Sequence, residues 1–137
     1  MKIGIAELLK KVSEEKSKNA RVKMLRENAS FPLKILLQYT FDPNIKWLLP
    51  EGKAPYKKSN LEDLETVFFS EARRLYLFIE GGNNDLKQNR RETLFIELLE
   101  SLAPDDADLL VAAKDKRNPY PYITYKLAKE AFPDLLP

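Results

Sequence analysis

The chain has 137 residues, of which 44% are hydrophobic and 32% charged, a balance typical of one globular domain with one core. Because it contains no Cys and no His, the sequence excludes disulfides, thiolate nucleophiles, imidazole acid–base catalysis and the usual zinc sites. The net charge of +2 is unevenly spread, since residues 1–58 hold 13 Lys and Arg against 6 Asp and Glu, and the remainder holds 10 against 15. This asymmetry favours a polyanionic partner for the N-terminal half, although solvated helix surfaces give the same pattern.

Apolar side chains recur at three- and four-residue spacing in every long segment, which predicts amphipathic helices. In the first of these, Ile5, Leu8 and Val12 share one face. Ser30 is placed to cap the third helix, with Pro32 at a tolerated first-turn position. The few glycines and scattered β-branched residues argue against a strand-rich fold. We expect helices over about residues 3–15, 17–28, 30–39, 61–80, 85–102, 104–114 and 122–131, with a short turn over 44–49.

The segments between these helices interrupt regular structure. Residues 50–58, PEGKAPYKK, contain two prolines and a glycine, which predicts a loop. Ser59 and Glu62 match a capping box that opens the longest helix, and Gly81-Gly82 ends it. No repeat, low-complexity tract or linker divides the sequence. We therefore predict an all-α fold, with a single helical domain covering residues 1–137.

The N-terminal segment bears on the location of the protein. Lys10 and Lys11 come too early for the apolar core of a signal peptide. No apolar run approaches the roughly 18–20 residues that cross a bilayer. We expect a soluble cytoplasmic protein without a membrane partner, and the absence of Cys fits a reducing cytosol.

Motifs for catalysis or cofactor binding are missing from the sequence. It contains no GxxxxGK[ST] phosphate-binding loop, no GxGxxG and no Lys-x-Asp-Gly signature of nucleotidyltransferases. We therefore predict a protein that is not an enzyme and binds neither a cofactor nor a metal. Two acidic groups lie in predicted first turns, where carboxylates stabilise helix N-termini, and we interpret both as caps. They are Glu62, Asp63 and Glu65, and Asp105, Asp106 and Asp108.

Residues 114–126, KDKRNPYPYITYK, combine a basic loop with a helix start that carries Tyr, Thr and Lys. Free backbone N–H groups and the helix dipole favour anions at such a start, and flanking cations suit a phosphate. The alternative, a solvated turn with partly buried tyrosines, is the more ordinary arrangement. The residues alone leave both open.

Two arginine pairs and three aromatic residues have ordinary interpretations. Neighbouring helix positions point about 100° apart, so at most one member of Arg73-Arg74 or of Arg90-Arg91 can line a given face. We expect these faces to be solvated.

Three aromatic residues are expected in the core rather than on a stacking platform: Tyr39, Phe41 and Trp47.

Residues 97–137 also carry a family resemblance. The last helix and its exit match the pattern Ile/Val-Ser-x-x-x-Ala-x-x-x-Phe/Trp-Pro-x-Leu-Ile-Pro. The matching residues are Ile123-Thr124, the small Ala128 and FPDLLP at residues 132–137. This stretch is similar to the C-terminal part of the helical DNA-binding domain that precedes the catalytic core of ATP-dependent DNA ligases, especially phage-type ones. The chain departs from that family at residues 118–121, where Asn-Pro-Tyr-Pro replaces a glycine.

The resemblance implies about seven orthogonally packed helices, as in that ligase domain, and binding of duplex DNA through its phosphates. It suggests Lys116, Arg117, Thr124 and Lys126 as contacts. Composition adds two lysines of the loop over residues 50–58, which are Lys57 and Lys58.

The whole chain resembles a small protein family of tailed phages that infect marine bacteria, through residues 29–57 and 86–101. We therefore predict a non-catalytic phage accessory protein that binds double-stranded DNA in the cytoplasm of the infected host. One alternative is a protein-binding adaptor that acts on a host or phage replication or transcription complex without contacting DNA. Another is a minor component of the virion.

Overall fold

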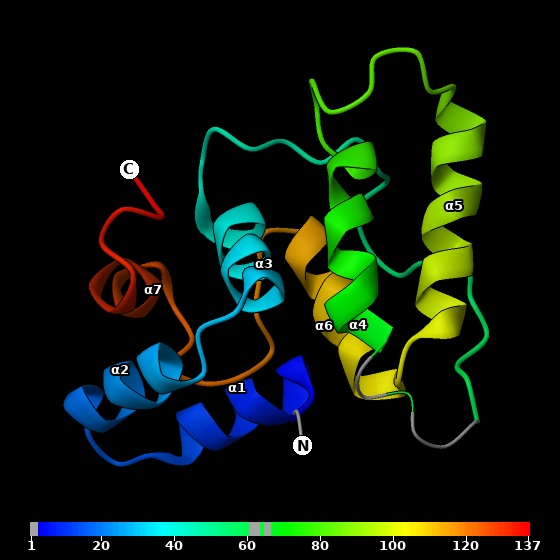
Figure 1. The fold of residues 1–137 in the computed structure, drawn as a ribbon. Helices are drawn as coiled ribbons and strands as arrows, with labels where there is room; N and C mark the ends of the chain where they lie inside the picture. Colours follow the sequence, from blue (N-terminus) through cyan, green and yellow to red (C-terminus); the bar gives the residue numbers. More distant parts are fainter. Residues whose placement is uncertain (1–2, 61–63, 65–66) are drawn as a thin grey trace.

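The computed structural model describes residues 3–60, 64 and 67–137 (Figure 1). All regular structure in these residues is helical, apart from one isolated β-bridge, so the predicted all-α class is confirmed. One hydrophobic core unites the helices. The seven α-helices and one 3₁₀-helix of this part of the chain are Ile5–Glu14 (α1), Lys18–Glu27 (α2), Phe31–Phe41 (α3), Val67–Glu71 (α4), Ala72–Phe78 (η1, the 3₁₀-helix), Gln88–Ser101 (α5), Pro104–Lys114 (α6) and Tyr125–Ala131 (α7).

Local capping explains why most helix boundaries lie within three residues of the predicted ones. The hydroxyl of Ser17 accepts from the backbone N–H of Ala20 at 3.1 Å and opens α2. That of Ser30 accepts from Leu33 N–H at 3.3 Å and opens α3. Each cap satisfies a donor that has no partner within its own helix. The predicted helix over 104–114 matches α6 without correction.

The predicted helix over residues 61–80 is wrong in its extent. Its first turn, including Glu62 of the capping box, falls largely outside the described residues, and Leu64 is not helical. The α-helical part is only α4, which tightens into η1 and ends at Phe78. The carbonyls of Leu77 and Phe78 accept from the Arg91 guanidinium and from Leu48 N–H, so they are not available to continue a helix.

The segment around Trp47 is extended where a short turn over 44–49 was expected. The turn closes at Asn44, and Trp47 then forms the isolated bridge with Ile79. The indole N–H donates to the carbonyl of Tyr39 at 2.9 Å, and the two rings meet edge to face at 6.0 Å. Tyr39 and Trp47 therefore lie in the core, as predicted, while Phe41 is half-buried against it.

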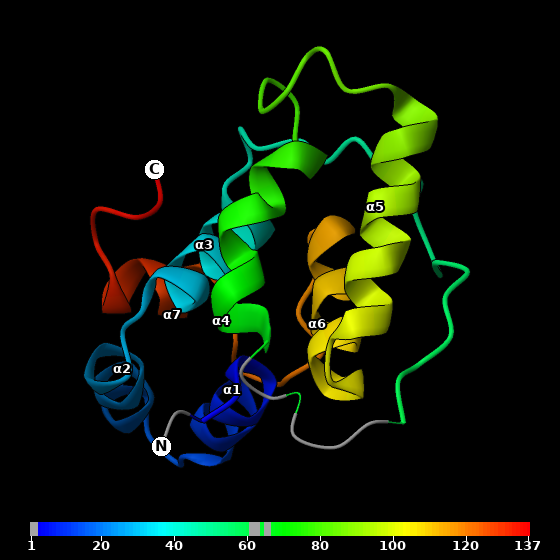
Figure 2. The ribbon, with the colours of Figure 1, turned by 45° about the vertical axis from the view of Figure 1, so that its right-hand side comes forward.

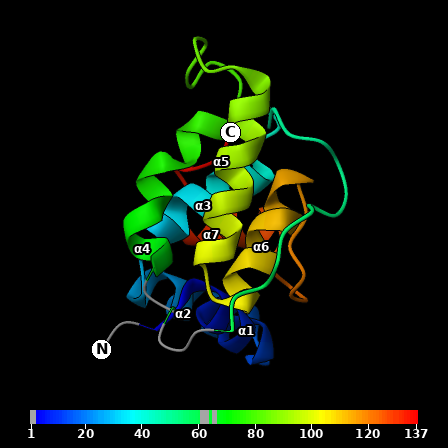
Figure 3. The ribbon, with the colours of Figure 1, turned by 90° about the vertical axis from the view of Figure 1, so that its right-hand side faces the viewer.

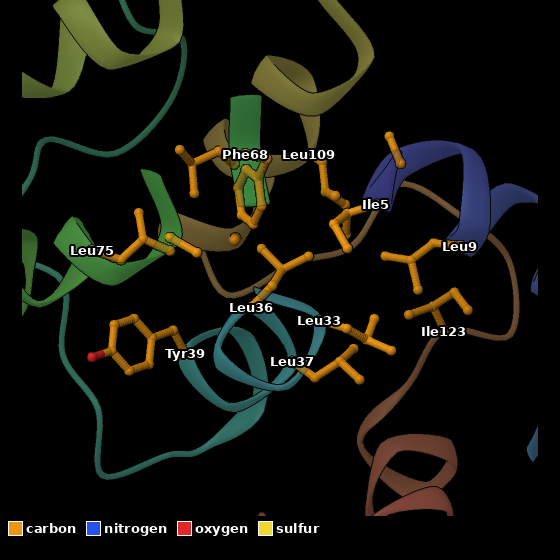
Figure 4. Packing of buried hydrophobic residues seen from close by; sticks show 14 of the residues in the cluster. Ile5, Leu9, Leu33, Leu36, Leu37, Tyr39, Phe68, Leu75, Leu109 and Ile123 are labelled. Atoms are coloured by element: carbon orange, nitrogen blue, oxygen red, sulfur yellow. The ribbon is translucent and has the colours of Figure 1, made fainter. Parts of the chain in front are cut away.

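The helices cross one another. α1 and α2 lie across the direction of α4 and α5, and α6 stands between α1 and α5 (Figures 1 and 2). Residues 50–60 run along the outside of α5 and α6 (Figure 3). α3 occupies the centre, where its apolar side chains meet those of α1, α4, α6 and the approach to α7 (Figure 4). Each fully buried leucine there contributes about 1.5–3 kcal/mol.

Buried polar side chains tie distant segments together. Asp106 is buried and accepts from Ala6 N–H in the first turn of α1 at 3.0 Å, whereas α6 itself has no side-chain cap. Asp105 and Asp106 lie in the first turn of α6, as predicted, and the Asp106 oxygen also caps α1, which the sequence did not predict. The expectation of solvated faces is correct for Arg90, which is exposed, and wrong for Arg91. Arg91 is buried because its guanidinium donates to the carbonyls of Leu77, Asn83 and Leu86.

Candidate nucleic-acid interface

The six residues predicted to contact DNA lie in three separate places. Lys57 and Lys58 belong to residues 50–58, hereafter the strap. The backbone N–H of Lys57 donates to a carboxylate oxygen of Glu100 at 2.9 Å, and the Lys58 ammonium pairs with Asp108 at 3.0 Å. These two lysines therefore lie beside carboxylates that weaken their attraction for phosphate.

Lys116 has an unusual environment at the C-terminal end of α6. Its ammonium donates to three backbone carbonyls, those of Tyr39 at 3.0 Å, Asp42 at 2.7 Å and Ile45 at 3.0 Å. Burial lowers the pKa of Lys116, while the carboxylate of Asp42 acts in the opposite direction. All three ammonium protons have an acceptor, so Lys116 ties α3 to α6, and its role as a phosphate contact stays a prediction.

The other three predicted residues are exposed. Arg117 keeps 64% of its side chain in solvent and lies 3.8 Å from Asp115. Thr124 is the N-cap of α7 and accepts from Leu127 N–H at 3.3 Å, while its own hydroxyl proton remains to donate. Lys126 is exposed two residues further on. Figure 1 shows that the chain leaves α6 beside α3 and travels to α2 before α7 begins.

A further cation joins Thr124 and Lys126 at the start of α7. The guanidinium of Arg21, from α2, lies over the ring of Tyr122, with its central carbon 3.8 Å from the ring centroid. Its Nε also donates to the carbonyl of Glu15 at 3.0 Å. We call Arg21, Tyr122, Thr124 and Lys126 the Tyr122 cluster. Arg21 was absent from the sequence prediction, because no pattern pairs residues about one hundred positions apart.

Tyr122 is both exposed and strained. Its side chain is 58% exposed, and its φ of 68° lies in the left-handed region that glycine favours. This conformation costs about 1–2 kcal/mol for an L-residue. It persists because the flanking segments are fixed: Ile123 is buried, and Tyr120 N–H donates to the side chain of Asn118 at 2.9 Å.

Charge also distinguishes this end of the molecule. Residues 118–129 contain Lys126 and Lys129 and no Asp or Glu, and the Lys129 ammonium donates to the carbonyl of Leu136 at 2.7 Å. α2 is held against α7 because Arg26 donates to the carbonyls of Ala131 at 2.9 Å and Glu130 at 2.8 Å. Lys18 pairs with Glu130 at 2.9 Å. The Tyr122 cluster is thus presented by two helices that are fixed to each other.

A groove of about 540 Å³ lies on the other side of the molecule, between the strap and α5. The strap is fastened at Gly52, whose carbonyl accepts from the Lys114 ammonium at 2.6 Å and whose N–H donates to Asp115 at 3.1 Å. The hydroxyl of Tyr56 donates to Asp108 at 3.2 Å. Apolar side chains make up much of the lining: Leu49, Pro50, Ala54, Pro55, Phe95 and Ile96.

Comparison with known proteins identifies a family. The model of a family of unknown function, DUF6433, matches residues 8–118. The chain belongs to this family. The DUF6433 match runs from α1 to just beyond α6 and includes the strap and the groove, whereas Tyr122 and α7 follow it. No curated protein and no solved structure matches the chain.

Neither a membrane-spanning helix nor a metal-binding cluster is found in the described residues. Among the helices described, none is long and apolar enough to span a bilayer. The described residues also contain no group of three acidic side chains that could hold a metal ion.

Proposed function

We propose that the chain is a non-catalytic DNA-binding protein that holds duplex DNA through its phosphates at the Tyr122 cluster. The observation that carries this proposal is the Arg21–Tyr122 pair, in which Tyr122 is exposed, beside the exposed Thr124 and Lys126. Guanidinium, hydroxyl and ammonium donors are the groups that proteins direct at phosphate oxygens.

The geometry favours a different set of contacts from the sequence prediction. Lys126 and the hydroxyl of Thr124 can reach phosphates, and Arg21 can offer its terminal nitrogens while its Nε keeps the bond to the Glu15 carbonyl. Arg117 is exposed beside Asp115 at the end of α6. Lys58 and Lys116 are engaged with Asp108 and with backbone carbonyls, and Lys57 lies beside them on the strap. We therefore move the proposed interface to α2 and α7.

The ligase-like pattern of residues 97–137 agrees with this location, because it includes Thr124 and the whole of α7. The positive φ of Tyr122, just after residues 118–121, is compatible with that location. On the same resemblances we propose an accessory protein of a tailed phage, acting in the cytoplasm of the infected host.

The test is a titration of a short fluorescent duplex by anisotropy at about 50 and about 200 mM salt. The apparent association constant should fall with salt at a log–log slope of about −0.9 per phosphate contacted, whatever the sequence. Arg21→Gln and Lys126→Ala should each flatten the slope by about 1. Lys57→Ala is the matched control and should change nothing. A chain that does not bind at the lower salt, or that loses affinity only in the control, contradicts the proposal.

The groove supports a second candidate, an adaptor that receives an apolar segment of a replication or transcription protein. Its apolar lining beneath a strap held by polar contacts has the character of a binding groove. Thr93→Arg places a cation in the groove from an exposed position, and Glu97→Arg, which is exposed on the same helix but does not line this groove, is the control. If the chain is an adaptor, a partner protein should copurify with the wild type after nuclease treatment. The same protein should copurify with Glu97→Arg and not with Thr93→Arg. Finding the chain in purified virions would instead support a virion component.

A further inference from the structure

The ring of Tyr122 combines properties that binding phosphate alone does not explain. Phosphate contacts need donors, and the cluster already has them in Arg21, Thr124 and Lys126. Tyr122 adds an apolar ring that is 58% exposed, on a backbone conformation unfavourable for a bulky residue. Strain that persists around an exposed side chain points to a role for the side chain itself.

The position of the ring is fixed by its neighbours. Arg21 lies over one face at 3.8 Å and is itself anchored to the carbonyl of Glu15, the residue that ends α1. On the chain side, buried Ile123 follows the ring immediately. A ring held in this way loses little conformational freedom when a ligand stacks on it, which favours binding.

The surrounding charge indicates the kind of ligand. An apolar protein segment would not need the cations Arg21 and Lys126, and an acidic one would not need an exposed aromatic ring. A nucleotide has both a planar base and a phosphate. Aromatic side chains stack on bases of any sequence, and an adjacent guanidinium strengthens such a platform. In intact duplex DNA the base faces are covered by their neighbours, so only an unpaired base can stack on the ring.

We propose that Tyr122 is a stacking site for an unpaired nucleobase next to duplex DNA, so that the protein prefers DNA in which a single strand meets a duplex. This inference rests on the proposed function, because the phosphate contacts of the Tyr122 cluster hold the duplex beside the ring. It goes further in assigning a base-binding role to one residue and a preferred form of DNA to the protein.

The experiment compares three labelled DNAs by anisotropy: an intact duplex, the same duplex with a short single-stranded overhang, and that overhang without its bases. The wild type should bind the overhang on the order of tenfold more tightly than the other two DNAs. Tyr122→Gly removes the ring but suits the positive φ, so the ratio of its affinities for the overhang and for the intact duplex should fall to about 1, whatever its affinity for the duplex. Tyr122→Phe keeps the ring and should keep the preference.

Each result decides a separate point. Equal binding of all three DNAs by the wild type overturns the stacking site and leaves duplex binding intact. A preference that survives in Tyr122→Gly, or that is unchanged when the overhang lacks bases, also overturns it. No binding of any DNA overturns the proposed function itself. Should Tyr122→Gly melt early, Tyr122→Asn replaces it, because Asn tolerates the same backbone region.

Discussion

Lys116 and Tyr122 are six residues apart and share a positive φ, yet one side chain makes contacts within the fold and the other is exposed. The Lys116 ammonium is half-buried on three carbonyls of the α3 end. The Tyr122 ring lies in solvent beneath Arg21. The positive φ of Lys116 accompanies contacts that stabilise the fold. The positive φ of Tyr122 accompanies a side chain that is exposed to solvent. Glycine, which accepts the backbone of both, is therefore the substitution that separates the two roles.

The largest effect is expected for Lys116→Gly. The variant keeps the backbone conformation but leaves three carbonyls without their charged donor, so we expect a loss of about 3 kcal/mol in the free energy of unfolding. Urea denaturation followed by Trp47 fluorescence measures it. Arg117→Gly is the neighbouring control, and it should cost much less because the Arg117 side chain is exposed. Equal losses at both positions would mean that the carbonyl contacts do not stabilise the fold.

Lys114→Met should have a smaller effect, about 2 kcal/mol. The side chain of Lys114 is 2% exposed, and methionine retains most of its volume but cannot donate to Gly52. Because the bond fastens the strap, amide hydrogen exchange should rise in residues 50–58 and not in α2. Unchanged exchange in the strap would show that its other contacts hold it alone. DNA binding at the distant Tyr122 cluster should remain normal.

Tyr122→Gly should leave stability within about 1 kcal/mol of the wild type. Relief of the backbone strain, about 1–2 kcal/mol, is offset by the greater freedom of glycine in the unfolded chain and by the lost contact with Arg21. Thermal melting provides the measurement. A loss comparable to that of Lys116→Gly would show that the Tyr122 ring supports the fold, which removes the contrast between the two sites.

The smallest effect concerns the strap at alkaline pH. Burial, and after it the carboxylate of Asp108, raises the pKa of Tyr56 to about 12. Since the unfolded value is about 10, the contribution of Tyr56 to stability is complete below about pH 10 and is lost as the pH rises through about 12. The wild type should therefore lose more stability than Tyr56→Phe over this interval, as measured by urea midpoints. Parallel losses in both proteins would contradict the assigned contact with Asp108.

Local chemistry accounts for what could be predicted from the sequence. Ser17, Ser30 and Pro104 act within a few residues of themselves, and the helices that they open are where the spacing predicts them. The shortened segment around η1 could not be predicted, because its end depends on Arg91, which is 14 residues from Leu77. The pattern of a helical face carries no information about such a donor.

The candidate site was less predictable for the same reason. Thr124 and Lys126 could be found from their neighbours, but Arg21 reaches Tyr122 only through the docking of α2 on α7. Lys116 was included because it is a cation in a basic loop, and its acceptors lie 71 to 77 residues earlier in the chain. Charge in a sequence thus gives the number of cations but not which of them face solvent.

The bond from Ala6 to Asp106 has a consequence for the order in which the molecule assembles. It joins the beginning of α1 to a residue 100 positions later. While the chain leaves the ribosome, α1 emerges long before the carboxylate that completes its first turn. α1 also packs against α6. Such distant pairing slows folding. The contacts of α1 are therefore complete only when nearly four-fifths of the polypeptide has been made.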